Sequence, residues 1–232
     1  MAENDQYSLK VTGLNVTLQN QIILSNLSFN VKKGATLAIL GPNGAGKSVL
    51  LRTLLNRLPY TGKVEWIEKT RIGYVPQNVS VSDMPMTVKE FLSMGKDTDV
   101  IELLKLVRIT DENILNKRLG VISGGQLRRI LIAWALNDNP NVLLLDEPTT
   151  GVDIDGEEPI YRMLNELKKA REMTIFLITH DIHIVQKYTD TLLAINKCIT
   201  FYGPSTEIAK STTQKLIYGE PVCVKTIKGE QD

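Results

Sequence analysis

The strongest constraint on the fold of this 232-residue chain lies between residues 37 and 55. Residues 41–48 match the pattern G-x-x-x-x-G-K-[ST], in which successive backbone N–H groups surround phosphate oxygens. The apolar run 37–40 before this loop is typical of a buried strand, and residues 49–55 after it have the pattern of a helix. A strand, a glycine-rich loop and a helix in this order predict a phosphate-binding loop, the P-loop, with a nucleotide as its ligand.

The residue types of the P-loop indicate separate roles. Its glycines allow backbone angles that side chains would block, so that N–H groups can point at phosphate oxygens. Lys47 is expected to reach the β- and γ-phosphates, and Ser48 is expected to bind Mg²⁺. The residues that we expect around the nucleotide phosphates are Gly41, Pro42, Asn43, Gly44, Ala45, Gly46, Lys47, Ser48 and Val49.

The second half of the chain predicts the fold class. Strand and helix patterns alternate from residue 142 onward, with strands at 142–145, 174–178 and 191–195 and helices at 157–171 and 181–187. Such alternation is typical of a mostly parallel sheet covered by helices. We therefore expect an α/β protein, specifically a P-loop NTPase with a RecA-like core.

Two other regions depart from this alternation. Residues 7–31 alternate apolar and polar side chains, and two further short strands are expected at 63–67 and 71–75. We interpret these strands as an N-terminal antiparallel β region. Residues 87–136 show helical spacing instead, which indicates a helical insert.

These patterns lead to a domain prediction. The expected nucleotide-binding core consists of residues 1–77 and 137–232, with an antiparallel β subdomain at about 8–34 and 62–75. Residues 78–136 are expected to form a helical subdomain.

Composition narrows the classes of ligand and partner. The chain has 27 Lys and Arg against 26 Asp and Glu, a net charge of +1, so no nucleic-acid partner is expected. No apolar run approaches the roughly 18 residues that a membrane-spanning helix needs. We therefore expect a soluble chain, and this composition leaves docking on a membrane partner open.

A pair of carboxylates follows an apolar strand. Residues 142–145 are all apolar, and Asp146 and Glu147 come directly after them. In α/β sheets, ligands bind at the carboxyl ends of strands, where the P-loop is also expected. Asp146 is therefore expected in the Mg²⁺ shell, and Glu147 is expected to orient a water against the γ-phosphate.

A serine- and glycine-rich segment, residues 122–126 (Ile-Ser-Gly-Gly-Gln), precedes an apolar-periodic helix. Serine and glycine are also ordinary helix-cap and turn residues, so this segment alone is weak. The order P-loop, Gln77, Ser-Gly-Gly-Gln, Asp146-Glu147, Asp153, His180 resembles the ATP-binding subunits of ABC transporters. The resemblance covers about residues 9–220, and we call residues 122–126 the signature segment.

The resemblance implies the remaining site residues. In this family the signature helix serves the ATP held by a second copy, so Ser123, Gly124, Gly125 and Gln126 imply a homodimer that sandwiches ATP. Gln77 is implied to contact Mg²⁺ and the attacking water. His180 is implied to bind the γ-phosphate. Asp153 is implied to lie in a loop that crosses the dimer interface.

Three stretches, residues 71–77, 151–156 and 180–185, look most like the zinc and manganese uptake branch of the family. This resemblance implies a polytopic membrane permease as partner and, indirectly, a solute-binding protein. It also implies a peripheral location on the cytoplasmic face of the cell membrane. Two alternatives stay open: an importer ATPase for iron chelates or another small solute, and a non-transport ABC ATPase.

Among the departures from the family pattern, Ile122 replaces a leucine and Trp134 stands where an arginine is common, and two others concern the nucleotide pocket. Leu18 stands where the family usually has an aromatic residue that stacks on adenine. A leucine can pack on the base but lacks an aromatic face, and it also continues the strand alternation of this region. Val49 stands where a threonine is common, which removes a hydroxyl contact to the α-phosphate. The leucine at position 18 predicts weaker or less base-selective nucleotide binding.

Overall fold

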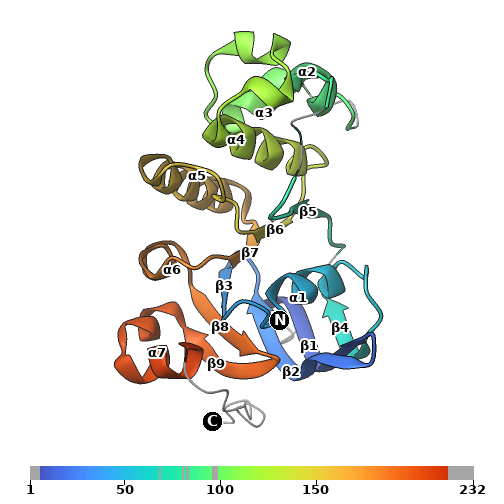
Figure 1. The fold of residues 1–232 in the computed structure, drawn as a ribbon, viewed down its shortest axis with the longest axis vertical. Helices are drawn as coiled ribbons and strands as arrows, with labels where there is room; N and C mark the ends of the chain where they lie inside the picture. Colours follow the sequence, from blue (N-terminus) through green and yellow to red (C-terminus); the bar gives the residue numbers. More distant parts are fainter. Residues whose placement is uncertain (1–5, 68, 80, 82–83, 96–98, 219–232) are drawn as a thin grey trace. The chain divides into compact units, whose positions relative to one another are not determined.

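The computed structural model describes residues 6–67, 69–79, 81, 84–95 and 99–218. The chain forms two compact units, one built from the residues up to Thr70 and from Thr174 onward, the other from Arg71–Met173. Figure 1 shows their elements along the chain. Among the described residues, no helix combines the length and the apolar character needed to cross a bilayer.

The first unit contains the predicted antiparallel region. Strands β1 (Tyr7–Leu18), β2 (Gln21–Lys32) and β4 (Thr61–Trp66) form a three-stranded sheet with β1 in the middle and antiparallel to both neighbours. Its inward side chains alternate with exposed ones along β1, and Leu14 and Val16 are fully buried. The period-2 pattern of the sequence therefore marks one buried and one solvated face, as expected for an antiparallel sheet.

The same unit contains parallel strands. Strand β3 (Thr36–Leu40) lies between β7 (Thr174–Ile178) and β8 (Thr191–Asn196) and is parallel to both. Every residue of β3 and β7 is buried, which explains why these strands read as continuous apolar runs. Strand β9 (Cys198–Pro204), which the sequence analysis did not predict, pairs antiparallel with β8.

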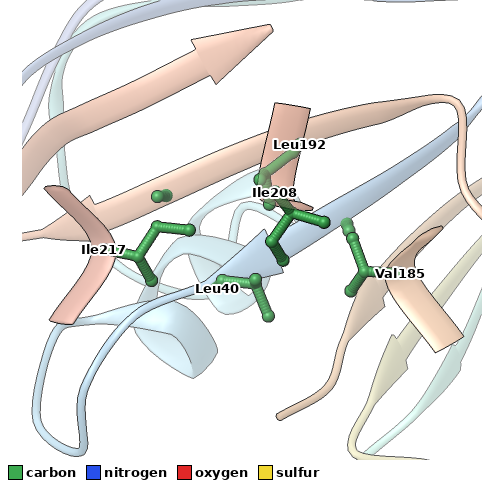
Figure 2. Packing of buried hydrophobic residues seen from close by; sticks show 7 residues of the cluster. Leu40, Val185, Leu192, Ile208 and Ile217 are labelled. Carbon is green, nitrogen blue, oxygen red and sulfur yellow. The ribbon is translucent and has the colours of Figure 1, made fainter. Parts of the chain in front are cut away.

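Helices of the first unit pack on these strands. They are α1 (Lys47–Leu54), α6 (Ile182–Tyr188), α7 (Ser211–Tyr218) and the 3₁₀ segment η4 (Ser205–Ala209). Figure 2 shows a buried cluster that joins α6, η4 and α7 to the sheet and includes Leu40, Val185, Leu192, Ile208 and Ile217. Because Leu40 is the last residue of β3, this cluster anchors the point at which the chain enters the P-loop.

The second unit contains two parallel strands, β5 (Ile72–Val75) and β6 (Val142–Asp146), paired in register from Ile72 with Val142. The sequence predicts that residues 71–75 belong to the antiparallel region, and this is wrong, because β5 pairs in parallel with β6. Gly73 leaves no space for a side chain, since a Cβ on it would lie 2.3 Å from the carbonyl oxygen of Ala135. The end of the signature helix can therefore approach the backbone of β5.

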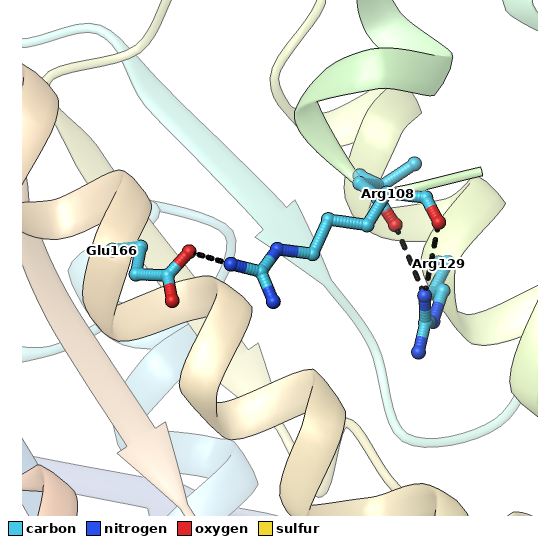
Figure 3. A network of polar contacts seen from close by, with 4 residues as sticks. Arg108, Arg129 and Glu166 are labelled. Atoms are coloured by element: carbon cyan, nitrogen blue, oxygen red, sulfur yellow. Dashed lines mark hydrogen bonds and ion pairs between the residues drawn. The ribbon is translucent and has the colours of Figure 1, made fainter. Parts of the chain in front are cut away.

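Helices complete the second unit, as the helical spacing predicts. They are α2 (Val88–Leu92), α3 (Val100–Leu106), η2 (Glu112–Asn116), η3 (Leu119–Val121), α4 (Gly124–Ala135) and α5 (Ile154–Arg171). Figure 3 shows how arginines tie three of them together. Arg108, just after α3, pairs with Glu166 of α5, and Arg129 of α4 donates to the carbonyl oxygens of Val107 and Arg108 at 3.5 and 3.2 Å.

Candidate nucleotide site

The P-loop connects β3 to α1, and its backbone has the shape that the motif predicts. Gly41 and Gly46 both have positive φ values, 150° and 96°. A Cβ on Gly41 would lie 2.0 Å from the carbonyl oxygen of Ile195, and one on Gly46 would lie 2.6 Å from a methyl group of Leu24. Glycine is therefore required at both ends of the loop by conformation and by close packing.

The side chain of Lys47 folds back over this loop. Its exposed fraction is only 8%, and its Nζ donates to the carbonyl oxygens of Gly41 at 2.8 Å and Pro42 at 3.0 Å. A cation is thus held against a loop whose tip, Asn43 and Gly44, is exposed to solvent. An exposed loop tip with a cation fixed beside it at the start of a helix fits phosphate groups.

In the second unit, two predicted site residues from distant parts of the chain meet. Gln77 follows β5, and Glu147 follows β6, next to the buried Asp146. The Nε2 of Gln77 donates to Oε2 of Glu147 at 2.7 Å. Glu147 has a φ of 49°, an uncommon value for a residue with a side chain. A carboxylate at the end of a strand is thus held by an amide from the neighbouring strand's loop.

The signature segment begins helix α4 and forms a capping box. The hydroxyl of Ser123 accepts from the backbone N–H of Gln126 at 3.2 Å, and Oε1 of Gln126 accepts from the N–H of Ser123 at 3.1 Å. A Cβ on Gly124 would lie 2.1 Å from the carbonyl oxygen of Gly151, so the turn after β6 packs directly against the helix start. In this structure the segment is therefore a helix cap, as serine at such a position predicts.

A pocket of about 330 Å³ adjoins the signature segment. Ser123, Gly125 and Gln126 line it together with Arg108 and Arg129. Ser123 itself is exposed. Asp111 also lines this pocket and Arg108 is paired with Glu166, so the features that favour a negatively charged ligand here are the start of the twelve-residue helix and Arg129.

The other predicted residues lie at the ends of elements. His180 follows β7 and is exposed, while the next residue, Asp181, caps α6 by accepting from the N–H groups of His183 and Ile184. Asp153 is exposed at the start of α5. Leu18 is half-buried at the end of β1, opposite Gln21 across a tight hairpin.

The structure is compatible with both interpretations of Leu18, as a strand residue and as a contact to the base. Leu18 is part of a strand, as its alternation indicates, and its side chain is half-exposed, so it has surface to offer to a base. Val49 lies in the first turn of α1 and is also half-buried.

One residue at the site was missed by the sequence analysis. Arg128 of α4 is 92% buried, and it donates from Nε to the carbonyl oxygen of Thr150 at 2.8 Å and from Nη2 to that of Gln77 at 2.9 Å. Burial lowers the pKa of its guanidinium, and the charge of Glu147 acts in the opposite direction. The sequence does contain a signal for its burial. Arg128 lies at helical spacing on the same face of the helix as the apolar Leu131 and Ala135, which are buried.

Comparisons with known proteins agree with this arrangement. A family model described as ABC transporter matches residues 24–150, more than half of the chain. The zinc import ATP-binding protein ZnuC of Histophilus somni (strain 129Pt) is 38% identical over 84% of this chain and 75% of that protein. The ZnuC of Buchnera aphidicola subsp. Schizaphis graminum (strain Sg) is 34% identical over 91% and 90%.

A solved structure has the same fold. It belongs to an ABC transporter assigned to the metal-chelate type, in an inward-facing conformation, and matches with a TM-score of 0.81 and 29% identity. The match covers 91% of this chain and 88% of that one. The P-loop, the paired Gln77 and Glu147 and the signature helix thus occur in a chain that matches this family in sequence and in fold. The chain belongs to the ABC transporter family, as a subunit that binds and hydrolyses ATP.

Proposed function

We propose that ATP is hydrolysed at a site shared by two copies of this chain arranged head to tail. In this proposal one copy supplies the P-loop, and the other supplies the signature segment with Ser123 and Gly125. The observation that carries the hydrolysis step is the hydrogen bond from Gln77 to Glu147, because it holds a carboxylate ready to orient a water. The exposed Ser123 beside a pocket supports the contribution of the second copy.

We assign the chemical steps as follows. Lys47 and the backbone N–H groups of the P-loop stabilise the charge that spreads over the γ-phosphate. Glu147 orients the attacking water and accepts its proton, with Gln77 fixing the carboxylate. His180 donates a hydrogen bond to the γ-phosphate. The nucleotide contacts assigned to the P-loop are Gly41, Pro42, Asn43, Gly44, Ala45, Gly46, Ser48 and Val49.

Further contacts are proposed around the same nucleotide. Leu18 packs against the base, while Gly124, Gln126 and Asp153 act at the interface between the copies. Mg²⁺ is assigned to Ser48, Gln77 and Asp146, whose hydroxyl, amide and carboxylate oxygens are the hard donors that this ion prefers. When bound, Mg²⁺ supplies neutralisation of the phosphate charge.

The test of this proposal is the substitution Glu147→Gln. It keeps the size and hydrogen-bonding reach of the side chain but removes the proton acceptor, so we expect ATP hydrolysis to fall at least about 100-fold. ATP binding should persist, and the variant should accumulate as an ATP-bound dimer. Phosphate release and size-exclusion chromatography with light scattering measure both effects. Near-normal steady-state turnover would remove Glu147 from this role.

We further propose that residues 78–136 form the subdomain that contacts a polytopic membrane permease, with 1–77 and 137–232 as the nucleotide-binding core. Exposed apolar side chains support this docking role. Met94, just after α2, is 62% exposed, and Trp134 of α4 is 40% exposed while stacking on Phe91 with ring centroids 5.7 Å apart. In this arrangement the chain is peripheral, on the cytoplasmic face of the membrane.

The proposed cargo is a divalent metal ion such as zinc or manganese, delivered to the permease by a solute-binding protein. The names of the ZnuC relatives support zinc. The metal-chelate assignment of the similar structure keeps an iron-chelate or other solute importer as the second candidate. Copurification of the tagged chain with a polytopic membrane protein tests the transport role. Association with ribosomes or DNA instead would support a non-transport ATPase.

A further inference from the structure

Arg128 occupies an unusual position within the second unit. It lies on helix α4, five residues after Ser123, yet its guanidinium is directed at two loops rather than at solvent. One bond reaches the backbone of Gln77 after β5, and the other reaches the backbone of Thr150 in the turn after β6. These two loops are the ones that flank the carboxylate of Glu147.

The contacts close into a ring of four residues. Arg128 donates to the carbonyl oxygens of Gln77 and Thr150, and the side chains of both residues in turn donate to Oε2 of Glu147, at 2.7 Å from Gln77 and 3.4 Å from Thr150. The guanidinium therefore contacts the backbone of the two residues whose side chains hold the carboxylate. Its positive charge is also favoured by the negative charge of Glu147.

We propose that Arg128 is a positioning residue for hydrolysis: its two hydrogen bonds fix Gln77 and Thr150 so that both hold the Glu147 carboxylate in place. The planar fork of arginine can reach two separate carbonyl oxygens at once, which a lysine cannot do with the same geometry. Glu147 also has a positive φ of 49°, a sparsely populated conformation for a residue with a side chain. This inference rests on the proposed role of Glu147.

A purely structural role predicts a different outcome. If Arg128 only fills space and satisfies carbonyl groups, its loss would lower stability and leave the turnover of the folded protein unchanged. If it positions the carboxylate, its loss acts on the rate of the chemical step more than on ATP binding. A 1 Å displacement of a catalytic group is enough to slow a reaction about 100-fold.

The test compares Arg128→Gln and Arg128→Lys with the wild-type chain. We expect kcat for ATP hydrolysis to fall about 10- to 100-fold in both, with the KM for ATP within about threefold of wild type. Amide hydrogen exchange of the ligand-free protein should become faster in residues 76–79 and 148–151. Arg128→Lys keeps the positive charge but lacks the planar guanidinium group. This variant provides the test if Arg128→Gln does not fold.

Arg71→Gln is the matched control. Arg71 also donates from its Nε to a backbone carbonyl, that of Asn139, at 2.9 Å, but it belongs to no part of the ring around Glu147. We expect this variant to keep wild-type kcat and wild-type exchange in residues 76–79. A loss of kcat equal to that of Arg128→Gln would count against a specific role for Arg128.

A second substitution shows whether Arg128 acts through Gln77. In a Gln77→Ala background, Arg128→Gln should cost clearly less than it does alone, because the shared carboxylate contact is already gone. Additive losses would overturn the inference, as would a kcat within twofold of wild type in both Arg128 variants.

If Glu147→Gln is inactive while the Arg128 variants are active, only this inference fails. If Glu147→Gln remains active, the assignment of Glu147 itself fails.

Discussion

Tyr202 is a single residue that links two sheets of the first unit. It lies on β9, and its hydroxyl donates to the carbonyl oxygen of Asn30 on β2, while its ring lies near that of Phe29 with centroids 6.4 Å apart. Burial raises the pKa of Tyr202 above its ordinary value. The neutral hydroxyl is therefore the form that the fold stabilises, and this form is the one able to donate the bond.

The direction of the pKa shift leads to a pH-dependent prediction. The unfolded chain ionises its tyrosines near pH 10, before the folded chain ionises Tyr202, so this contribution to stability is complete below about pH 10 and is lost as the pH rises through the folded pKa. Tyr202→Phe should therefore lower the free energy of unfolding by about 1 kcal/mol at pH 7. The difference from wild type should shrink above about pH 10. Urea unfolding at the two pH values measures it, and a pH-independent difference would contradict the assignment.

At the level of elements, the sequence predicts best where a strand is a buried apolar run with clear boundaries. β7 was predicted at residues 174–178 and lies there, and β3 ends where the P-loop glycines begin. Such runs are buried on both faces, so their composition alone identifies them. The antiparallel region is equally readable, because alternation marks one buried face.

Pairing partners are less predictable, because they depend on contacts that are distant in sequence. β5 has four residues, too few to show whether it continues the antiparallel region or joins β6 in parallel. The missing side chain of Gly73 admits the carbonyl of Ala135 at the end of α4, a close contact between residues 62 positions apart. Likewise, β9 was not predicted, since its burial changes along its length from the buried Cys198 to the exposed Pro204.

In the candidate site, too, local sequence patterns predict which residues take part but not the contacts between residues that are distant in sequence. Motif order placed Gln77 and Glu147 in one site, and in the second unit they are hydrogen-bonded. Motif order did not predict that Gly124 packs against the backbone of Gly151, or that Arg128 bridges Gln77 and Thr150. These contacts depend on how α4 lies against the turn after β6, which no local pattern specifies.

At the scale of the whole molecule, both halves of the proposed shared site face solvent in a single chain. Asn43 and Gly44 are exposed in the P-loop, and Ser123 and Gly124 are exposed at the start of α4. The P-loop serves the nucleotide of its own chain. The start of α4, whose N–H groups also favour an anion, is therefore available to the nucleotide of a second chain. This exposure is what a head-to-tail dimer would cover, and the contribution of each half can be tested separately.

The substitution Ser123→Arg in a Glu147→Gln background separates the two halves of the site. A long side chain at the exposed start of α4 would block a facing nucleotide, yet the P-loop of the same chain is unchanged. We therefore expect the double variant to bind a fluorescent ATP analogue with an affinity within about threefold of Glu147→Gln alone. Light scattering with ATP should find it monomeric, where Glu147→Gln alone is dimeric.

Because Ser123 also caps α4, a cost of about 1 kcal/mol in stability is expected. Ser123→Asn, which keeps a capping side chain, controls for that cost and should still dimerise with ATP. ATP-dependent dimers of the Ser123→Arg double variant would show that the signature segment of one chain does not close over the nucleotide of the other.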